Sequence, residues 1–268
     1  MVERITITIK KDLLKRIDGM VDKRTVRNRS HAIENILSRS LSSTGLDTAL
    51  IMAGGHGLGD LPKSMVRIHG KPILEHQINM LRRNGITNIL LALGSMDKTI
   101  NDYFGDGGRL GVSIKYITED MPMGTAGPIA LAGEHIEKSF VLLNVDTLLN
   151  PNIYEMYEFH RQNRKMATVL LSTVDDTKHF GVVNMRGNQI LNFVEKPKKG
   201  SYSKLINAGL CIFERSVVNM VPNRRFMIQE LFSTLSRQEQ LVGFLHDGKT
   251  FDVGTKEGYE RAMKEWGK

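Results

Sequence analysis

From Asp47 onward, the sequence alternates between short apolar runs and segments whose apolar residues recur with helical spacing. The apolar runs lie at 48–53, 88–93 and 140–144, and the helical patterns at 73–84 and 98–104. Short apolar runs between helical segments are typical of strands that are buried on both faces of a parallel sheet. We therefore expect an α/β, Rossmann-like domain with a mostly parallel sheet and helices on both faces.

The remaining elements of this domain follow from the same patterns. We expect a strand at 113–117 and a helix at 125–134. Strands at 168–173, 181–184 and 190–195 are expected to form a hairpin-like insertion, after which 208–213 returns to the core sheet.

The first 45 residues follow different patterns. Residues 2–9 alternate between β-branched apolar and polar side chains, which predicts a strand. Residues 11–21 and 31–41 have helical spacing, and Ser30 is the expected N-cap of the second helix. Residues 42–45, a Ser-Ser-Thr-Gly sequence, predict a short flexible hinge. The expected domains are therefore 1–43 and 47–268.

The net charge of +8 is concentrated in the amino-terminal segment. Residues 1–45 hold ten Lys or Arg against five Asp or Glu, whereas the remaining 223 residues hold 27 against 24. This asymmetry favours a polyanionic partner for the amino-terminal segment, although a well-solvated terminus explains the charge equally well.

One strand and two helices bury little surface in about 40 residues, and a lone strand leaves both of its edges unpaired. Both problems are solved if two copies pair their strands antiparallel and interlock their helices. A homodimer, or a higher even oligomer, is therefore expected.

This β-α-α segment resembles the ribbon-helix-helix DNA-binding proteins in its strand Arg4–Ile9, its amphipathic first helix and the Asn28–Ile33 opening of its second helix. The resemblance implies a two-stranded ribbon in the DNA major groove and a helix start near phosphate. The expected DNA-binding residues are Arg4, Thr6, Thr8, Lys10, Arg29 and Ser30. A dimerisation arm that contacts no DNA is the alternative.

A glycine-rich turn, Gly54-Gly55-His56-Gly57-Leu58-Gly59, directly follows the first apolar run. Glycines allow backbone amides to approach an anion closely, and Lys63 and Lys71 follow within the next residues. The turn alone is a weak signal, because it also fits plain turns.

Two carboxylates are the candidate metal ligands. Asp146 follows the apolar run 140–144, and Asp252 lies in a tight turn before Gly254. Ligands bind at the carboxyl ends of strands in open α/β sheets, and carboxylates there can hold Mg²⁺ that bridges phosphates. A loop-capping role for Asp146 is equally consistent with the sequence.

From residue 47 to 268 the chain resembles the sugar-1-phosphate nucleotidylyltransferases, and within them the mannose-1-phosphate guanylyltransferase branch, whose domain is of the GT-A type. The matching segments occur in the family's order: Met52–Gly55, Leu61–Lys63, Gly70–Leu74, Met123–Pro128, Asn144–Asp146, Phe180–Val183, Phe193–Pro197, Ile206–Gly209 and Asp252–Thr255.

The resemblance implies a role for each matching position. The expected nucleotide-binding residues are Ala53, Gly54, Gly55, Gly57, Gly124 and Thr125. Lys63, Asp146 and Asp252 are implied to be catalytic, with both aspartates holding Mg²⁺, and Glu195, Lys196 and Asn207 to bind the sugar phosphate. In the family, a sugar-1-phosphate oxygen attacks the nucleotide α-phosphorus and pyrophosphate leaves.

The sequence departs from the family pattern in the first loop, where Leu58 and Gly59 stand in place of Thr and Arg and the loop is shorter. Loss of one such transition-state contact typically costs about 10²–10³ in rate. Val145 also replaces the usual Gly before Asp146. These changes predict weak or absent transferase activity.

Three hypotheses follow. The first is a DNA-binding transcriptional regulator whose larger domain binds a nucleotide, sugar nucleotide or sugar phosphate as effector. The second is an active sugar-1-phosphate nucleotidylyltransferase with a dimerising arm. The third is a structural protein without a ligand.

Other features exclude some classes of protein. Cys211 is the single cysteine, so no intrachain disulfide forms, and its apolar neighbours favour a buried core residue over a reactive one. No apolar stretch approaches the length of a membrane span, and no signal sequence is visible. A cytoplasmic protein without membrane contact is expected.

Overall fold

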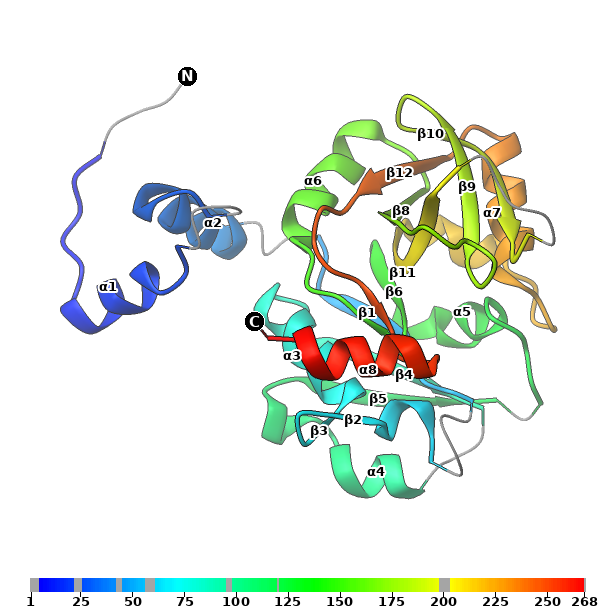
Figure 1. The fold of residues 1–268 in the computed structure, drawn as a ribbon, viewed down its shortest axis with the longest axis horizontal. Coiled ribbons are helices and arrows are strands. Elements are labelled where there is room, and N and C mark those ends of the chain that lie inside the picture. Colours follow the sequence, from blue (N-terminus) through cyan, green and yellow to red (C-terminus); the bar gives the residue numbers. More distant parts are fainter. Residues whose placement is uncertain are drawn as a thin grey trace. The chain divides into compact units, whose positions relative to one another are not determined.

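The computed structural model describes residues 5–21, 26–41, 45–55, 61–94, 98–119, 121–197 and 203–267. The chain divides into two compact units, Met1–Thr44 and Gly45–Lys268, and each is described here by itself (Figure 1). Arg4 and the loop 56–60, which includes Gly57, lie outside the described residues.

The first unit contains two helices, α1 (Lys11–Asp18) and α2 (Arg29–Leu41). Helix α2 begins earlier than the sequence pattern indicates. The Asn28 side-chain oxygen accepts a hydrogen bond from the His31 backbone N–H at 2.9 Å. Asn28 is therefore the N-cap, and the expectation that Ser30 caps this helix is wrong.

The expected amino-terminal strand is not formed in residues 5–9, the described part of that segment. Ile5 and Ile7 are 68% and 51% exposed. A strand needs a neighbour to accept and donate its backbone hydrogen bonds, and within the described part of a single chain these residues have none in a ladder. The alternating pattern is present, but nothing in the described chain pairs with it.

The second unit is built on a nine-stranded sheet in the order β5-β4-β1-β6-β11-β8-β12-β10-β9. The strands span β1 (Thr48–Met52), β4 (Asn88–Leu93), β5 (Ser113–Thr118), β6 (Phe140–Asn144), β8 (Ala167–Thr173), β9 (Gly181–Arg186), β10 (Gln189–Glu195), β11 (Leu205–Phe213) and β12 (Leu241–Leu245).

The sheet is mixed, which corrects the expectation of a mostly parallel one. Strands β5, β4, β1 and β6 are parallel neighbours, as are β8 and β12. The pairings β6–β11, β11–β8, β11–β9, β12–β10 and β10–β9 are antiparallel. The expected hairpin insertion is therefore part of the same sheet, because β11 joins β6 to β8 and β9.

Two short ladders lie outside the large sheet. Strand β2 (Arg67–Ile68) pairs with β3 (Lys71–Pro72), and β7 (Thr147–Leu148) pairs with β13 (Phe251–Asp252), both antiparallel. The second ladder joins segments that are about a hundred residues apart in the chain, and it determines where Asp252 lies.

Helices cover both faces of the sheet, as the sequence predicts. Residues that alternate along β1 belong to different cores: Ala49 and Ile51 pack on one side and Leu50 on the other. The first side carries α3 (Ile73–Arg83), α4 (Lys98–Phe104), α6 (Ile153–Asn163) and α8 (Lys256–Glu265), and the second α5 (Gly127–Leu131) and α7 (Ile228–Arg237).

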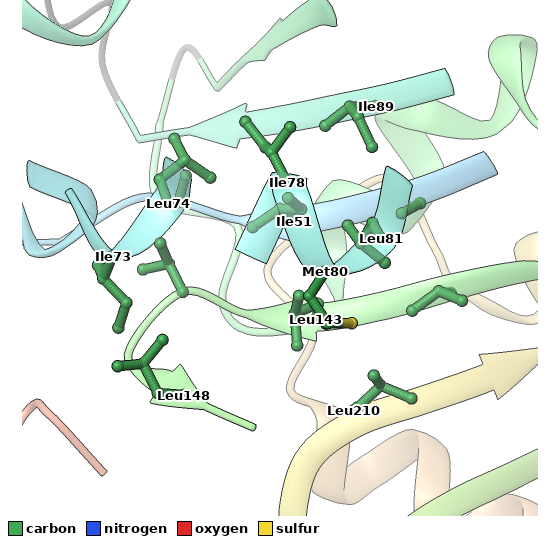
Figure 2. Packing of buried hydrophobic residues seen from close by; sticks show 14 of the residues in the cluster. Ile51, Ile73, Leu74, Ile78, Met80, Leu81, Ile89, Leu143, Leu148 and Leu210 are labelled. Atoms are coloured by element: carbon green, nitrogen blue, oxygen red, sulfur yellow. The ribbon is translucent and has the colours of Figure 1, made fainter. Parts of the chain in front are cut away.

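Figure 2 shows the first of these cores around α3. Leu74, Ile78 and Leu81 of this helix pack against strand residues that include Ile51 and Leu143, and all of them are fully buried. Tight packing of this kind fixes the position of α3 over the strands whose carboxyl ends carry the candidate site.

The expected helix at 125–134 is shorter than predicted. Helix α5 starts at Gly127, with Pro128 in its first turn, and gives way to a 3₁₀ helix, Ala132–His135. Three further 3₁₀ helices span Lys63–Met65, Gly108–Leu110 and Arg215–Met220. In the described ranges, no helix has the length and hydropathy needed to cross a membrane.

Candidate active site

The start of the glycine-rich turn after β1 lies beside the first candidate lysine, Lys63. The Ala53 backbone N–H donates to Ala92 O at 2.9 Å, and the Lys63 N–H donates to Gly55 O at 3.2 Å. Gly55 has φ +95°, a backbone conformation that residues with a side chain rarely adopt. A Cβ on Gly54 would lie 3.0 Å from the Gly94 nitrogen. Both glycines are therefore needed for the turn that brings Lys63 next to the end of β1.

Lys63 and Asp146 form an ion pair in the site. The Lys63 Nζ lies 3.1 Å from Asp146 Oδ2, although 83 residues separate them in the chain. Asp146 directly follows the buried Val145 at the end of β6, the strand that pairs in parallel with β1. The structure thus brings together two of the three residues that the sequence predicts to be catalytic.

The β7–β13 ladder brings the third, Asp252, to the same place. Asp252 pairs in register with Thr147, and the Val253 N–H donates to Asp146 O at 2.9 Å. Asp252 Oδ1 accepts from the Gly254 N–H at 3.0 Å. A Cβ on Gly254 would lie 3.6 Å from Asp146 Oδ2 and 3.1 Å from Asp252 Oδ1, so this glycine lies beside both carboxylates.

Burial and the nearby negative charge of Asp146 raise the pKa of Asp252 above its ordinary value. The Gly254 amide and the positive charges of Lys63 and His179 act in the opposite direction. A carboxylate whose charge is disfavoured by burial and by a second carboxylate nearby lies in a site where a hard dication is favoured.

These two carboxylates fit the Mg²⁺ predicted from the sequence. Their oxygens are the ligand type that Mg²⁺ prefers, and Mg²⁺ usually takes one or two protein carboxylates, with phosphates and water completing the octahedron. Among the described residues, no group of three or more Asp, Glu, His or Cys could hold a metal.

Glu195 and Lys196 lie at the carboxyl end of β10, beside the start of β9. The Lys196 N–H donates to Phe180 O at 3.0 Å, and Lys196 has φ +45°, which is uncommon for a residue with a side chain. Burial raises the pKa of Glu195, and the Lys196 charge opposes that shift. A Cβ on Gly181 would lie 2.9 Å from Glu195 Oε2, so the glycine leaves room for this carboxylate.

Asn207 lies in an irregular part of β11. Its side-chain oxygen accepts from the Gly209 N–H at 2.9 Å, and the pairing with β8 shifts register between Asn207 and Cys211. Gly209 has φ +81°, and a Cβ there would lie 2.6 Å from Thr147 Oγ1. Asn207 is therefore fixed next to the segment that carries Asp146.

Gly124 and Thr125 form the turn before α5. Gly124 has φ +80°, and a Cβ there would lie 2.7 Å from Phe226 O. Thr125 Oγ1 accepts from the Ile228 N–H at 2.9 Å. Gly124 thus contacts the segment before α7 and Thr125 contacts the first residue of α7, and these contacts hold the turn 123–126.

The expected DNA-binding residues in the described part of the first unit are exposed: Thr6, Thr8, Lys10, Arg29 and Ser30. Arg29 forms a two-point ion pair with Asp18, with distances of 2.7 and 2.9 Å. The sequence pattern did not indicate this contact, which engages the guanidinium within the unit.

Sequence reasoning missed two features near the carboxylates. Asp252 also lines an open cavity of about 870 Å³, shared with His179 and His246 among others. Gln77, a buried polar residue in the apolar stripe of α3, reaches the loop that carries Asp146. The sequence signal that could have identified Gln77 is the amide side chain that interrupts this apolar stripe.

The larger unit matches a known protein family. Residues 48–268 match the family model described as Nucleotidyl transferase. Mannose-1-phosphate guanyltransferase beta-A of Xenopus laevis is 32% identical over 228 residues, covering 80% of this chain and 63% of that protein. Mannose-1-phosphate guanyltransferase of Candida albicans is 35% identical over 222 residues, covering 76% and 60%. The chain thus spans less than two thirds of the length of these relatives.

Solved structures show the same fold. HddC from Yersinia pseudotuberculosis superposes with a TM-score of 0.71 at 26% identity, covering 81% of this chain and 98% of that one. The structure of HddC complexed with GMP-PN gives a TM-score of 0.69, with the same identity and coverage.

Proposed function

This chain belongs to the nucleotidyl transferase family, and we propose that it transfers a nucleoside monophosphate from a nucleoside triphosphate to a sugar-1-phosphate, with GTP and mannose-1-phosphate as the substrate pair. The observation that carries the proposal is the convergence of Lys63, Asp146 and Asp252, which are distant in sequence and meet at the end of β6. The names of the curated relatives support the choice of base and sugar.

In the proposed reaction, an oxygen of the sugar-1-phosphate attacks the α-phosphorus of the nucleotide. The new P–O bond forms as the bond to the bridging oxygen breaks, and pyrophosphate leaves. Such a transfer depends on positioning and charge neutralisation more than on covalent catalysis by the protein. Mg²⁺ held by Asp146 and Asp252 would neutralise phosphate charge.

The chain's own residues would supply the remaining contacts. Lys63 would exchange its ion pair with Asp146 for the nucleotide phosphates, and the amides of Gly54 and Gly55 would lie along the nucleotide. Lys196 would neutralise the sugar phosphate. Glu195 and Asn207 would hydrogen-bond sugar hydroxyls. Asn207 lies next to the segment 144–147, and Glu195 lies opposite Gly181 at the start of β9.

Pyrophosphate release from GTP and mannose-1-phosphate, with Mg²⁺, tests the proposal. The wild-type protein should release pyrophosphate only when both substrates are present, and Asp146→Asn should abolish release while the protein stays folded. Release that is unchanged in Asp146→Asn would assign the activity to another site or to a contaminant. No release with any nucleoside triphosphate and sugar-1-phosphate pair would contradict the proposed reaction.

The comparisons favour the transferase hypothesis over the regulator hypothesis, because the relatives are named as transferases. The amino-terminal unit still needs an explanation. Its described residues bury Ile17 and Ala32 among the hydrophobic side chains, while Ile5, Ile7 and Leu13 are exposed. We propose that residues 1–43 form a ribbon-helix-helix arm that pairs with a second copy and binds DNA.

Two matched substitutions test whether the arm and the transferase unit work separately. Thr6→Ala should weaken binding to DNA at low salt and leave nucleotide binding unchanged, whereas Lys196→Ala should weaken sugar-phosphate binding and leave DNA binding unchanged. Gel-shift and calorimetric titrations measure the two affinities. A folded wild-type protein that binds no DNA at low salt would leave the arm a dimerisation device.

A further inference from the structure

Residues 144–147, the β6–β7 loop, run from the last residue of β6 to the first residue of β7 and carry Asp146. Val145 and Thr147 are buried, Asp146 is half-buried and Asn144 is exposed, and a carbonyl that is left unpaired in a buried position costs free energy. The loop therefore needs hydrogen-bond donors from elsewhere in the fold. The residues that supply these donors determine how firmly the Asp146 carboxylate is held.

Gln77 supplies most of these donors. Its side-chain Nε2 lies 2.8 Å from Asn144 O, 3.2 Å from Val145 O and 2.7 Å from Thr147 O. The Asp146 carbonyl itself accepts from the Val253 N–H at 2.9 Å. Each of the four consecutive carbonyls thus has a donor within hydrogen-bond distance, and for three of them that donor is the one amide group of Gln77.

The orientation of this amide is unambiguous. Three carbonyl oxygens can accept hydrogen bonds but cannot donate them, so the NH₂ group and not the oxygen must face the loop. Two N–H groups then serve three acceptors, the longest contact being to Val145. Gln77 Oε1, in turn, is buried and has no hydrogen-bond partner among the described residues. The side chain thus directs its donors to the loop and leaves its own acceptor oxygen unpaired.

Gln77 is itself held rigidly. It is 2% exposed, and it lies on α3 between apolar residues such as Leu74, Ile78 and Leu81 that pack against the strands of the sheet (Figure 2). A polar side chain in such a stripe costs desolvation free energy that an apolar residue would avoid. That cost is offset only by the three contacts to the loop.

We infer that Gln77 is a positioning residue, which holds the Asp146 carboxylate beside Asp252 in the geometry that binds the divalent metal. The inference rests on the proposed function, because it assumes that these carboxylates bind the metal. Groups that orient a metal ligand typically contribute 10- to 100-fold to metal affinity. Gln77 does so through the backbone on either side of the ligand.

The test is direct binding of Mn²⁺ alone, measured from the loss of the free-ion signal in electron paramagnetic resonance. Gln77→Met keeps the length of the side chain and removes the donors, and should weaken Mn²⁺ binding by about 10-fold or more. Asn79→Met is the matched control. Asn79 lies on the same helix and donates to Glu75 O within it, so its loss should leave Mn²⁺ binding unchanged.

A second readout separates positioning from a purely structural role. In Gln77→Met the rate of pyrophosphate release should fall at limiting Mg²⁺ and recover as Mg²⁺ is raised, whereas a merely destabilised protein would show a lower unfolding temperature with an unaltered metal requirement. Gln77→Asn, which keeps the amide but shortens its reach by one methylene, should show a smaller loss and serves if Gln77→Met does not fold.

The outcomes distinguish this inference from the proposed function. Wild-type protein that binds Mn²⁺ through Asp146, with folded Gln77→Met and Gln77→Asn binding it equally well, would overturn the role of Gln77 alone. Wild-type protein that binds no Mn²⁺, or an Asp146→Asn variant that binds it as well as wild type, would overturn both.

Discussion

The two units of this chain differ in how completely they bury their apolar side chains. In the larger unit, both faces of the sheet are buried under helices, and Ile51 and Leu50 belong to separate cores on opposite faces. In the smaller unit, the alternating Ile5 and Ile7 are more than half exposed. The first has completed its core within one chain, while the second carries an alternating pattern that pairs with no strand among the described residues. A sequence pattern alone does not reveal which of these cases applies.

The polar contacts differ in the same way. The ion pair between Arg29 and Asp18 in the smaller unit is exposed, and exposed pairs contribute little to stability. In the larger unit, His160 is fully buried, with Nδ1 2.8 Å from Thr168 Oγ1 and Nε2 3.1 Å from Glu214 Oε1. Buried networks of this kind fix one arrangement of their elements. The larger unit should therefore carry both the stability and the precise geometry.

Asp252→Asn should have the largest effect, and it should be confined to the chemistry of the larger unit. Loss of one of the two proposed metal carboxylates is expected to lower the rate of pyrophosphate release by about 10²–10³-fold or more, as for other lost transition-state charge contacts. Steady-state kinetics measure it. Because burial and Asp146 already penalise the Asp252 charge, the metal-free variant should unfold at the same or a higher temperature. A clear loss of thermal stability would show that Asp252 is mainly structural.

Gly258→Ala should damage the fold of the larger unit. A Cβ there would overlap the backbone oxygen of Asp252 at the start of α8. Overpacking of this kind typically costs about 1–3 kcal/mol in the free energy of unfolding, which denaturant titration measures. Gly94→Ala is the control, because a Cβ at Gly94 meets no atom within 4 Å. Equal stability of the two variants would contradict the described packing of α8.

Glu214→Gln should have the smallest effect, visible as a change in pH dependence. Hydrogen bonding from His160, its charge when protonated, and the Ser139 hydroxyl lower the pKa of Glu214, against the effect of burial. A carboxyl with a lowered folded-state pKa stabilises the fold above its ordinary pKa, and this stabilisation is lost as the pH falls through the folded value. Wild type should therefore exceed Glu214→Gln in unfolding temperature near neutral pH, and the gap should close in acid. A gap that does not vary with pH would assign the effect to packing.

Much of the larger unit could be predicted from local pattern. The expected strands at 88–93 and 140–144 and the helix at 98–104 match β4, β6 and α4 residue for residue. Strand and helix type depend on periodicity and β-branching, which are local properties of the sequence. The mixed direction of the sheet was missed, because the pairing of β11 with both β6 and β8 is decided by contacts between distant segments.

The site was predictable in part for the same reason. Asp146 and Asp252 were singled out by their position and by resemblance, but their proximity depends on the β7–β13 ladder, whose two-residue strands have no periodic signal. The role of Gln77 could not be read from the sequence, because its three acceptors lie about 70 residues away, where β6 ends and β7 begins. The Asn28 cap was missed because Ser30, two residues later, has the same preference for that position.

The central claim is that the smaller unit pairs two copies while the larger unit carries out the transfer. It is tested most directly by Ile7→Lys in the full chain, with mass and turnover measured on one preparation. A charge on the apolar side of residues 5–9 should weaken pairing of two copies by at least about 10-fold, since burial of an Ile side chain contributes about 1.5–3 kcal/mol. Thr8→Lys, on the polar side, is the control. We predict that wild type and Thr8→Lys are dimers by sedimentation and that Ile7→Lys is a monomer. The rate of pyrophosphate release per chain should be the same in all three. An Ile7→Lys protein that keeps the wild-type mass, or that becomes monomeric and loses turnover, would contradict the central claim.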